Sequence, residues 1–439
     1  MNSNQNQDQR LISLFTACCM VVANMIGTGV FTSLGFQAGD IKSGFALLCL
    51  WLVGGILALC GALCYGELAA VMPRSGGEYH YLSKIYHPAV GFLSGWLSAT
   101  VGFAAPIAAA AMALGQYFSQ VFPVFHPTAI AVAVAVGVSL IHTRDVKLGT
   151  YFQNGFTLLK ILLILTLVVC GLWLGKPQDI GFLPGSEDLN LIFSSPFAIS
   201  LVFVMYAYSG WNASIYIASE VREPEKNIPR SLLAGTLIVM AIYLAVNFIF
   251  LHTTPIEALA EAKEKVGAVA AKQIFGELGG NIMSLLISLG LVSSISSMVW
   301  AGPRVTQTIG EDIPFFKLLA TTNAKGIPYY AILAQLAIVL VLVITSSFES
   351  VITYLGFTLT LSSFLTVFGV FAHRFKYPDV PRPYKTWGYP VTPIVFLAIS
   401  LWMLVFIFTG KPTESLAGLG TILLGLPVYF FADKQRLVS

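Results

Sequence analysis

Long apolar runs separated by short polar stretches are the dominant pattern along the chain. A membrane-spanning helix needs about 20 mostly apolar residues, and twelve runs approach or exceed this length. They cover approximately residues 12–39, 44–72, 88–121, 126–142, 151–175, 194–220, 229–254, 279–309, 327–345, 349–373, 390–410 and 413–433. The strands of an outer-membrane barrel would instead alternate apolar and polar positions. The pattern therefore predicts an all-α polytopic membrane protein with twelve transmembrane helices.

The composition excludes an ordinary soluble protein. Of the 439 residues, 56% are hydrophobic and only 10% are charged, whereas a soluble domain carries about 25% charged residues. The net charge of +3 is too small to indicate a nucleic-acid partner, so the lipid bilayer is the expected surrounding. The first apolar run is longer than a signal peptide, and we expect it to remain as a transmembrane helix.

The distribution of lysine and arginine predicts the orientation of the chain. If residues 1–10 are cytoplasmic, 17 of the 24 basic residues fall in segments on the cytoplasmic side and six fall outside. Cytoplasmic loops carry the excess of basic residues in membrane proteins. We therefore expect residues 1–10 and 434–439 to be cytoplasmic tails of a multi-pass protein in the plasma (cytoplasmic) membrane.

Reactive side chains do not point to catalysis or to metal binding. All six cysteines lie within apolar runs, where small buried side chains are a simpler interpretation than disulfides or metal ligands. Glu67 and Glu220 lie near the cytoplasmic ends of their runs, and we expect them to pair with nearby arginine or lysine. No Ser–His or Asp pair stands at mid-depth to act as nucleophile and base. The sequence thus predicts a protein that is not an enzyme and holds no cofactor and no metal.

The first and sixth runs contain residues that interrupt a helix near the middle of the membrane. Gly27 and Gly29 flank a threonine in the first run, and Ser209 and Gly210 stand together in the sixth. Close helix packing by small residues is one interpretation. Unwound backbone is the other, because its N–H groups hold an anion and its C=O groups hold a cation. An α-amino acid zwitterion carries both charges at the required separation.

The positions of the two interruptions predict an inverted repeat. Interrupted spans at corresponding places in two halves of a chain are typical of transporters built in this way. Because five spans separate the interruptions, the second copy would enter the membrane from the opposite side. We expect the first repeat at 11–175 and the second at 194–373, followed by two further spans at 390–433. An amphipathic helix at 256–278 would lie outside the membrane, as a lid or as a plain connector.

Lys160 is the one basic residue placed deep within an apolar run. It lies about nine residues into the fifth run, which corresponds to a depth of about 13 Å. A buried ammonium needs oxygen partners, so such a residue is a candidate for function, although a lysine that reaches a water-filled crevice is the alternative. We expect it to contact backbone carbonyls at the first interruption and hydroxyls of the eighth run. The hydroxyls on offer are Ser293, Ser294, Ser296 and Ser297.

These motifs, in this order and spacing, resemble the amino acid–polyamine–organocation (APC) superfamily of transporters, and in particular a bacterial member near its L-type amino acid transporter branch. The matching stretches are Gly27-Thr28-Gly29-Val30-Phe31, Tyr65-Gly66-Glu67-Leu68, Pro73-Arg74-Ser75-Gly76-Gly77-Glu78-Tyr79, Gln153-Asn154-Gly155-Phe156-Thr157-Leu158-Leu159-Lys160 and Tyr206-Ala207-Tyr208-Ser209-Gly210-Trp211-Asn212. The resemblance implies a five-plus-five inverted repeat (a LeuT-like fold) with broken helices 1 and 6, and transport by alternating access.

The resemblance also implies which residues bind substrate. The amides of Thr28 and Gly29 would bind the carboxylate of an amino acid. The carbonyls of Met25, Tyr206 and Ser209 would bind its amino group.

Other roles follow from the same resemblance. Tyr206 or Tyr208 would cover the substrate as a gate, and Asn212 would tune the specificity for its side chain. Lys160 would take the place of the sodium ion used by sodium-driven relatives, with Ser293 and Ser296 beside it. Residues 119–127 hold no cysteine, so no disulfide-linked heavy subunit is expected.

Together these observations favour a sodium-independent transporter of neutral L-amino acids that works by exchange. No acidic residue stands at the interruptions, where Ser209 and Asn212 are neutral, and a cationic substrate would need a buried carboxylate. Proton-coupled uptake, including uptake of cationic amino acids, is the main alternative. A channel is a more remote one, because it would need rings of carbonyls or charges along a continuous pore.

Overall fold

The computed structural model describes residues 12–144, 146–346 and 348–436, and helices make up nearly all of the regular structure in these ranges. Up to residue 174 the helices are α1 (Leu14–Met25), α2 (Gly29–Asp40), α3 (Gly44–Val71), α4 (Glu78–Ile85), α5 (Pro88–Leu97), the π-helical turn η1 (Ser98–Gly102), α6 (Ala104–Val121), α7 (Pro127–His142) and α8 (Val146–Leu174). The predicted tail at 1–10 and the last residues, 437–439, lie outside the described residues.

The remainder of the chain is equally helical. It contains α9 (Asp188–Ile192), α10 (Ser195–Tyr208), η2 (Ala213–Glu220), α11 (Pro224–Thr253), α12 (Ile256–Ala262), η3 (Lys263–Lys265), α13 (Val266–Asp312), η4 (Pro314–Phe316), α14 (Lys317–Ala320), α15 (Tyr329–Thr345), α16 (Phe348–Lys376), α17 (Val391–Gly410) and α18 (Pro412–Arg436). The segment predicted as an outer helix at 256–278 forms α12, η3 and the start of α13, up to a kink at Gly276.

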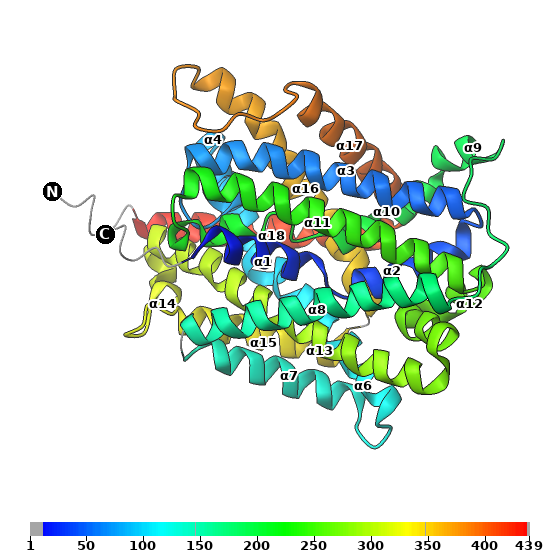
Figure 1. Ribbon diagram of the computed structural model, residues 1–439. Coiled ribbons are helices and arrows are strands. Elements are labelled where there is room, and N and C mark those ends of the chain that lie inside the picture. The colour runs from blue at the N-terminus through cyan, green and yellow to red at the C-terminus, as the bar shows by residue number, and fades with distance from the viewer. Residues whose placement is uncertain (1–11, 145, 347, 437–439) are drawn as a thin grey trace.

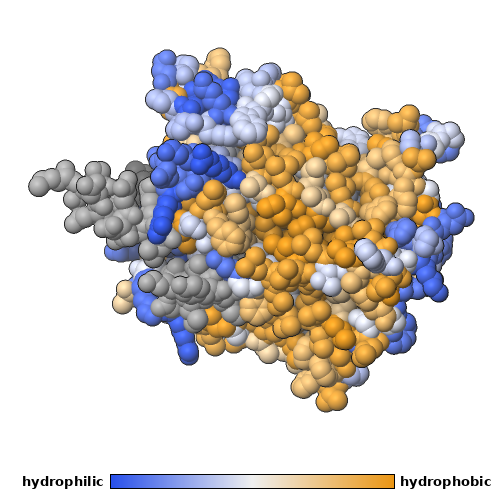
Figure 2. Space-filling view, in the orientation of Figure 1, coloured by the Kyte–Doolittle hydropathy of each residue, from blue (hydrophilic) through white to orange (hydrophobic). Residues whose placement is uncertain are grey.

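The spanning helices agree with the prediction of an all-α polytopic membrane protein. Within the described residues, nine helical segments are long and apolar enough to cross a membrane. Two shorter apolar helices, α7 and α15, correspond to the fourth and ninth predicted runs. The sixth run is divided into α10 and η2. Figure 2 shows apolar residues over the middle of the molecule and hydrophilic residues toward its two ends, as a membrane requires.

Helix α8 illustrates how one span serves both lipid and protein. Leu158, Leu162, Leu165, Val169 and Leu172 recur every three or four residues and are exposed, which places them on one helix face. The opposite face is buried. An apolar face without protein neighbours is expected where the helix meets lipid, so α8 lies at the rim of the bundle with one side turned inward.

The two ends of the molecule are distinguished by short helices and by tertiary hydrogen bonds. In Figure 1, α4 and α14 lie at the end where α1 begins and α18 finishes, called here the termini end, and α9 and α12 lie at the opposite end. At the termini end, Ile12 pairs with Val221: the Ile12 amide donates to the Glu220 carbonyl (3.0 Å) and the Arg222 amide donates to the Ile12 carbonyl (2.9 Å). Arg74 forms an ion pair with Asp312 (2.9 Å). These contacts join the start of the described chain to the end of η2, and the loop before α4 to the end of α13, at the termini end.

The prediction that Glu67 and Glu220 each pair with a basic residue is confirmed. Glu220 accepts a hydrogen bond from Arg304 (2.9 Å). Glu67 is 2% exposed and accepts from the Arg374 guanidinium (2.6 and 2.8 Å) and from the amide and hydroxyl of Thr386 (2.7 and 2.8 Å). The Glu67 carboxylate therefore joins the end of α3 to the end of α16 and to the loop that follows α16.

We predict that Glu67→Gln destabilises the protein by about 3 kcal/mol, because removing one partner of a buried pair leaves the other uncompensated. The measurement is the melting temperature of the detergent-purified protein. Glu223→Gln is the matched control, since Glu223 and its partner Lys226 are each more than 60% exposed (67% and 63%) and such pairs contribute little. Equal melting temperatures for the two variants would contradict the proposed role of Glu67.

Candidate functional site

The two interruptions read from the sequence are breaks in the helices. Helix α1 ends at Met25 and α2 begins at Gly29, so residues 26–28 form the first break. Helix α10 ends at Tyr208 and η2 begins at Ala213, so residues 209–212 form the second. Each break lies near the middle of a predicted span. The prediction of broken helices 1 and 6 is confirmed.

The two breaks touch, and glycine is required where they do. A Cβ added to Gly29 would lie 2.4 Å from the Cα of Ala207, closer than real atoms approach. Gly210 has a φ of +94°, in the left-handed region that glycine tolerates, and a Cβ there would lie 2.7 Å from the Cβ of Asn24. The glycines of each break therefore allow the backbone of the other to come into contact.

Lys160 points its ammonium at the first break. The side chain is 2% exposed. Its Nζ donates to the carbonyl of Ile26, to the carbonyl of Ala23 (3.4 Å) and to the hydroxyl of Ser294 (2.8 Å), and Ser294 in turn donates to the Ile26 carbonyl (2.7 Å). The expected combination of break carbonyls and a hydroxyl from the eighth run is what the structure places around this ammonium.

The two serines singled out beside Lys160 make different contacts. Ser293 lies within 3.2 Å of the hydroxyl of Thr157, and Ser296 lies 2.8 Å from the imidazole of His142. The serine that reaches the ammonium is Ser294. Neighbouring residues on a helix differ by about 100° in direction, so membership of the right span does not decide which hydroxyl faces Lys160.

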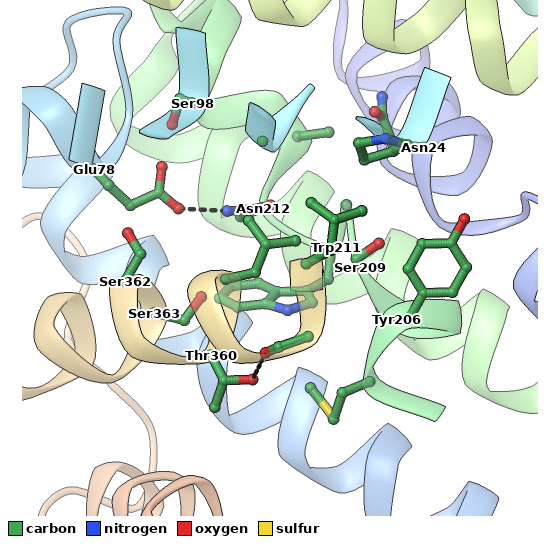
Figure 3. A pocket seen from close by; sticks show the side chains of 18 of the residues that line it. Asn24, Glu78, Ser98, Tyr206, Ser209, Trp211, Asn212, Thr360, Ser362 and Ser363 are labelled. Atoms are coloured by element: carbon green, nitrogen blue, oxygen red, sulfur yellow. Dashed lines mark hydrogen bonds between the residues drawn. The ribbon is translucent and has the colours of Figure 1, made fainter. Parts of the chain in front are cut away.

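A pocket lies beside the second break. Figure 3 shows Asn24, Tyr206, Ser209 and Asn212 among the residues that line it. The remaining polar side chains of its lining are Glu78, Ser98, Thr360, Ser362 and Ser363, and apolar side chains that include Trp211, Met298 and Leu355 fill the spaces between them. The pocket therefore combines an apolar wall with a few polar groups, as small-molecule sites generally do.

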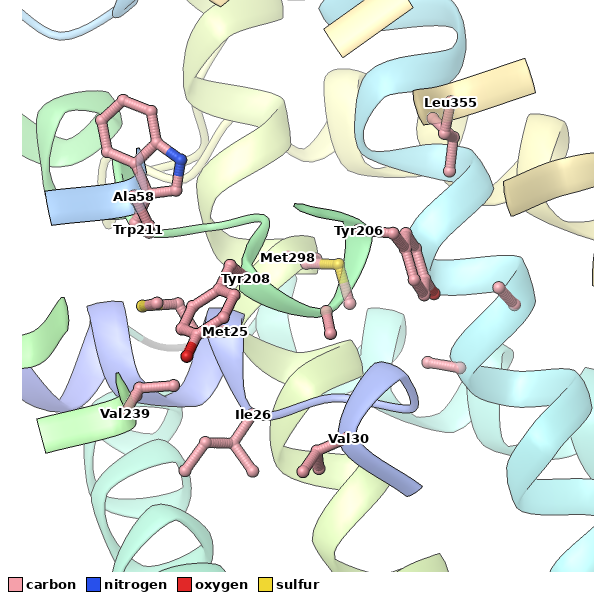
Figure 4. Packing of buried hydrophobic residues seen from close by; sticks show 14 of the residues in the cluster. Met25, Ile26, Val30, Ala58, Tyr206, Tyr208, Trp211, Val239, Met298 and Leu355 are labelled. Carbon is pink, nitrogen blue, oxygen red and sulfur yellow. The ribbon is translucent and has the colours of Figure 1, made fainter. Parts of the chain in front are cut away.

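The two tyrosines expected as gates both belong to α10, just before the second break, and point in different directions there (Figure 4). Tyr206 lines the pocket, and its hydroxyl lies 2.8 Å from the hydroxyl of Thr28. Tyr208 is fully buried and donates to the carbonyl of Trp51 (3.1 Å), against Tyr243. Only Tyr206 is placed to cover the pocket, and Tyr208 packs between helices.

The backbone groups of the first break differ in their availability. The Met25 carbonyl already accepts hydrogen bonds from the Gly27 amide (2.8 Å) and from the Tyr243 hydroxyl. Among the described residues, the amides of Thr28 and Gly29 donate to no acceptor. They stand at the N-terminus of α2, where unpaired amides and the helix dipole favour an anion.

Glu78 is the functional candidate that the sequence reasoning missed. Its carboxylate accepts a hydrogen bond from Asn212 (2.6 Å) at the second break, so an acidic group does stand at this site. Glu78 belongs to the loop helix α4, far from Asn212 in the sequence. The local sign of an inward-facing Glu78 in the sequence is the pair of glycines before it, Gly76 and Gly77. Both adopt a positive φ, which lets the chain turn sharply at this point.

Two broken spans that enclose a pocket in a bundle of apolar helices define a secondary transporter. The profile of the family described as "Amino acid permease" matches residues 12–427, and the chain belongs to this family, within the APC superfamily. The protein is therefore a multi-pass amino acid transporter and not an enzyme.

Curated relatives cover nearly the whole chain. The serine/threonine exchanger SteT of Bacillus subtilis is 29% identical over 99% of this chain and 100% of its own length. The large neutral amino acids transporter small subunit 2 of Mus musculus is 28% identical over 95% of this chain and 80% of its own. The human b(0,+)-type amino acid transporter 1 is 28% identical over 96% of this chain and 88% of its own.

We predict that Gly29→Ala destabilises the protein, because the methyl group would force the two breaks apart. Gly39→Ala is the matched control on the same helix, since a Cβ at Gly39 meets no atom within 4 Å. Alanine favours a helix over glycine by about 1 kcal/mol, so the control is expected to be neutral or more stable. Melting temperatures in detergent compare the two variants, and an equally stable Gly29→Ala protein would contradict the close contact.

Proposed function

We propose that this protein exchanges neutral L-amino acids across the plasma (cytoplasmic) membrane, without sodium, by alternating access. The observation that carries the proposal is that two amides without an acceptor among the described residues, at Thr28 and Gly29, lie next to a pocket at the second break, because the hydroxyl of Thr28 is 2.8 Å from that of the pocket residue Tyr206. A zwitterion offers a carboxylate to the amides and an ammonium to nearby carbonyls. Exchange is supported by the name of the Bacillus subtilis relative, a serine/threonine exchanger.

The proposed substrate contacts follow from this geometry. The amides of Thr28 and Gly29 bind the carboxylate, with the dipole of α2 behind them. The carbonyls of Tyr206 and Ser209 bind the amino group. The Met25 carbonyl joins them only if Tyr243 gives up its hydrogen bond to that oxygen.

The side chain of the substrate lies, in this proposal, toward Asn212 and the apolar wall. Tyr206 covers the substrate, and its hydrogen bond to Thr28 closes the site. Opening then requires this bond to break. The same bond joins the two breaks directly, which couples substrate release to a change in their relative position.

Sodium independence rests on Lys160. Its ammonium already supplies a positive charge to the Ile26 carbonyl and to Ser294, where a cation would otherwise be needed to satisfy these oxygens. An ammonium held within the protein makes an external sodium ion unnecessary at this place.

The orientation and assembly complete the proposal. The termini end is assigned to the cytoplasm on the basis of the lysine and arginine excess. No covalent heavy subunit is needed, because residues 119–127 contain no cysteine. The protein is thus expected to transport when purified and reconstituted alone.

The first test is uptake of radiolabelled alanine into sodium-free proteoliposomes without a pH gradient. We expect uptake only when the vesicles contain unlabelled neutral amino acid. In an exchanger the transporter changes orientation only with a substrate bound, so each labelled molecule that enters requires an unlabelled one that leaves. Vesicles loaded with a non-substrate sugar serve as the control. Equal uptake into empty vesicles would contradict exchange, and no uptake of any neutral amino acid would overturn the substrate class.

The second test concerns Lys160→Ala, which removes the ammonium and leaves the Ile26 carbonyl without its donor. We expect the variant to exchange slowly and to be less stable by about 1–3 kcal/mol, the cost of an unsatisfied buried polar group. Sodium chloride should raise its melting temperature more than choline chloride does, with no such difference for the wild type. Lys226→Ala, at an exposed position, is the control. Equal effects of the two salts on Lys160→Ala would contradict a cation-substituting role.

A further inference from the structure

Glu78 is a buried carboxyl group on the pocket wall with no assigned role. Its side chain is 5% exposed, and Figure 3 shows it facing Asn212 with Ser98 and Ser362 nearby. It begins α4, a short helix between two spanning segments. The preceding residue, Gly77, has a φ of +52°, and a Cβ added there would lie 2.4 Å from the ring of Tyr216.

The two oxygens of this carboxyl group are treated differently. Oε1 accepts hydrogen bonds from Asn212 (2.6 Å) and from the hydroxyl of Tyr65 (3.0 Å). Oε2 has no hydrogen-bond partner among the described residues. Asn212 also donates to Tyr216 (2.9 Å), so the amide is oriented by two partners and holds Oε1 in a fixed place.

No cation compensates this carboxyl group within the described part of the chain. Glu67, the other buried glutamate of this region, has Arg374 at 2.6 Å. The titratable groups that face Glu78 are phenols: Tyr65 from α3, Tyr216 from η2 and Tyr81 from its own helix. Phenols are neutral near pH 7, so they supply hydrogen bonds but no positive charge.

Burial without a cation favours the protonated form of a carboxyl group. For Glu78 burial raises the pKa above its usual range, although its own backbone and the neighbouring Tyr216, Tyr65 and Asn212 act in the opposite direction. A proton on Oε2 would also remove the cost of leaving a charged oxygen without a donor.

We propose that Glu78 carries a proton while η2 holds Asn212 against it, and loses that proton when η2 moves and water enters the pocket. The proposal rests on the pocket being the transport site. On release, the O–H bond of the carboxyl group breaks, the proton passes to water, and the hydrated carboxylate remains. The protonated form stabilises the closed pocket, so deprotonation favours opening and the exchange rate depends on pH.

The test compares the pH profile of alanine exchange in the wild type and in Glu78→Gln, which keeps the shape of the side chain and cannot ionise. We expect wild-type exchange to rise several-fold from acidic to alkaline pH. The variant should stay at the low-pH rate throughout. A wild-type profile in Glu78→Gln would overturn the proposal.

Two further variants sharpen this comparison. Tyr65→Phe removes a hydrogen-bond donor that lowers the pKa of Glu78. Alanine exchange by this variant should still depend on pH, with a midpoint at higher pH than in the wild type. Glu223→Gln, at an exposed position, should keep the wild-type profile. A loss of pH dependence in Glu223→Gln would overturn the assignment to Glu78.

Stability provides a readout that does not need transport. A carboxyl group whose pKa is raised by folding stabilises the native state below its unfolded pKa, about 4.3, and this contribution is lost as the pH rises through the folded value. The melting temperature of Glu78→Gln in detergent should therefore exceed that of the wild type increasingly as the pH rises. If the melting temperatures behave in this way but no neutral amino acid is exchanged, the proton site is supported and the proposed substrate is refuted. A constant difference at all pH values would overturn the proton site.

A cationic substrate side chain is the competing partner for Glu78. Exchange of radiolabelled lysine distinguishes the two. Lysine exchange that Glu78→Gln abolishes, with the pH profile of alanine exchange unchanged, would overturn the proton site and assign the carboxylate to substrate. Failure of lysine to exchange in the wild type, together with a flat alanine profile in Glu78→Gln, would support the proton.

Discussion

The structure depends on satisfying backbone groups that leave a helix inside a membrane. Where α1 stops at Met25, the chain exposes carbonyls that water would bind in a soluble protein. Here Lys160 donates to Ile26 and Ala23, Tyr243 donates to Met25, and Ser294 completes the set. Unsatisfied backbone in a bilayer is costly, so these donors make the break permissible. The amides of Thr28 and Gly29, by contrast, donate to no acceptor among the described residues.

The second break is held by different means. Its contact with the first break at Gly29 and Gly210 leaves no space for a side chain, and Tyr206 links the two through Thr28. The two breaks therefore behave as one packed unit at the centre of the bundle. Polar partners from outside this unit, Lys160 on one side and Glu78 on the other, each meet one break. The Lys160 ammonium donates to three oxygen atoms. The Glu78 carboxyl group has one oxygen without a hydrogen-bond partner among the described residues.

Periodicity and composition predicted the helical spans, both breaks and the meeting of Lys160 with the first of them. The spans and the breaks are local features, because apolar runs form spans and glycine weakens a helix. The contact between Lys160 and the first break joins residues 134 apart, and it was predictable because a buried ammonium needs the oxygens that unwound backbone exposes. Side-chain directions were not predictable in the same way. Ser294 rather than Ser293 faces Lys160, and Tyr208 turns away from the pocket, because each depends on helix rotation. Glu78 was missed because it stands in a polar stretch between two apolar runs, where a carboxylate is expected to face water, so nothing nearby in the sequence indicates that it is buried against Asn212.

The parallel bridge between Ile12 and Val221 ties the start of the chain to the far end of η2, the half-helix that follows the second break. Two main-chain hydrogen bonds, independent of side-chain identity, close the termini end at this point. Any rearrangement that moves η2 away from Ile12 must break both of these hydrogen bonds. The main chain at Ile12 therefore restrains the half-helix that follows the second break.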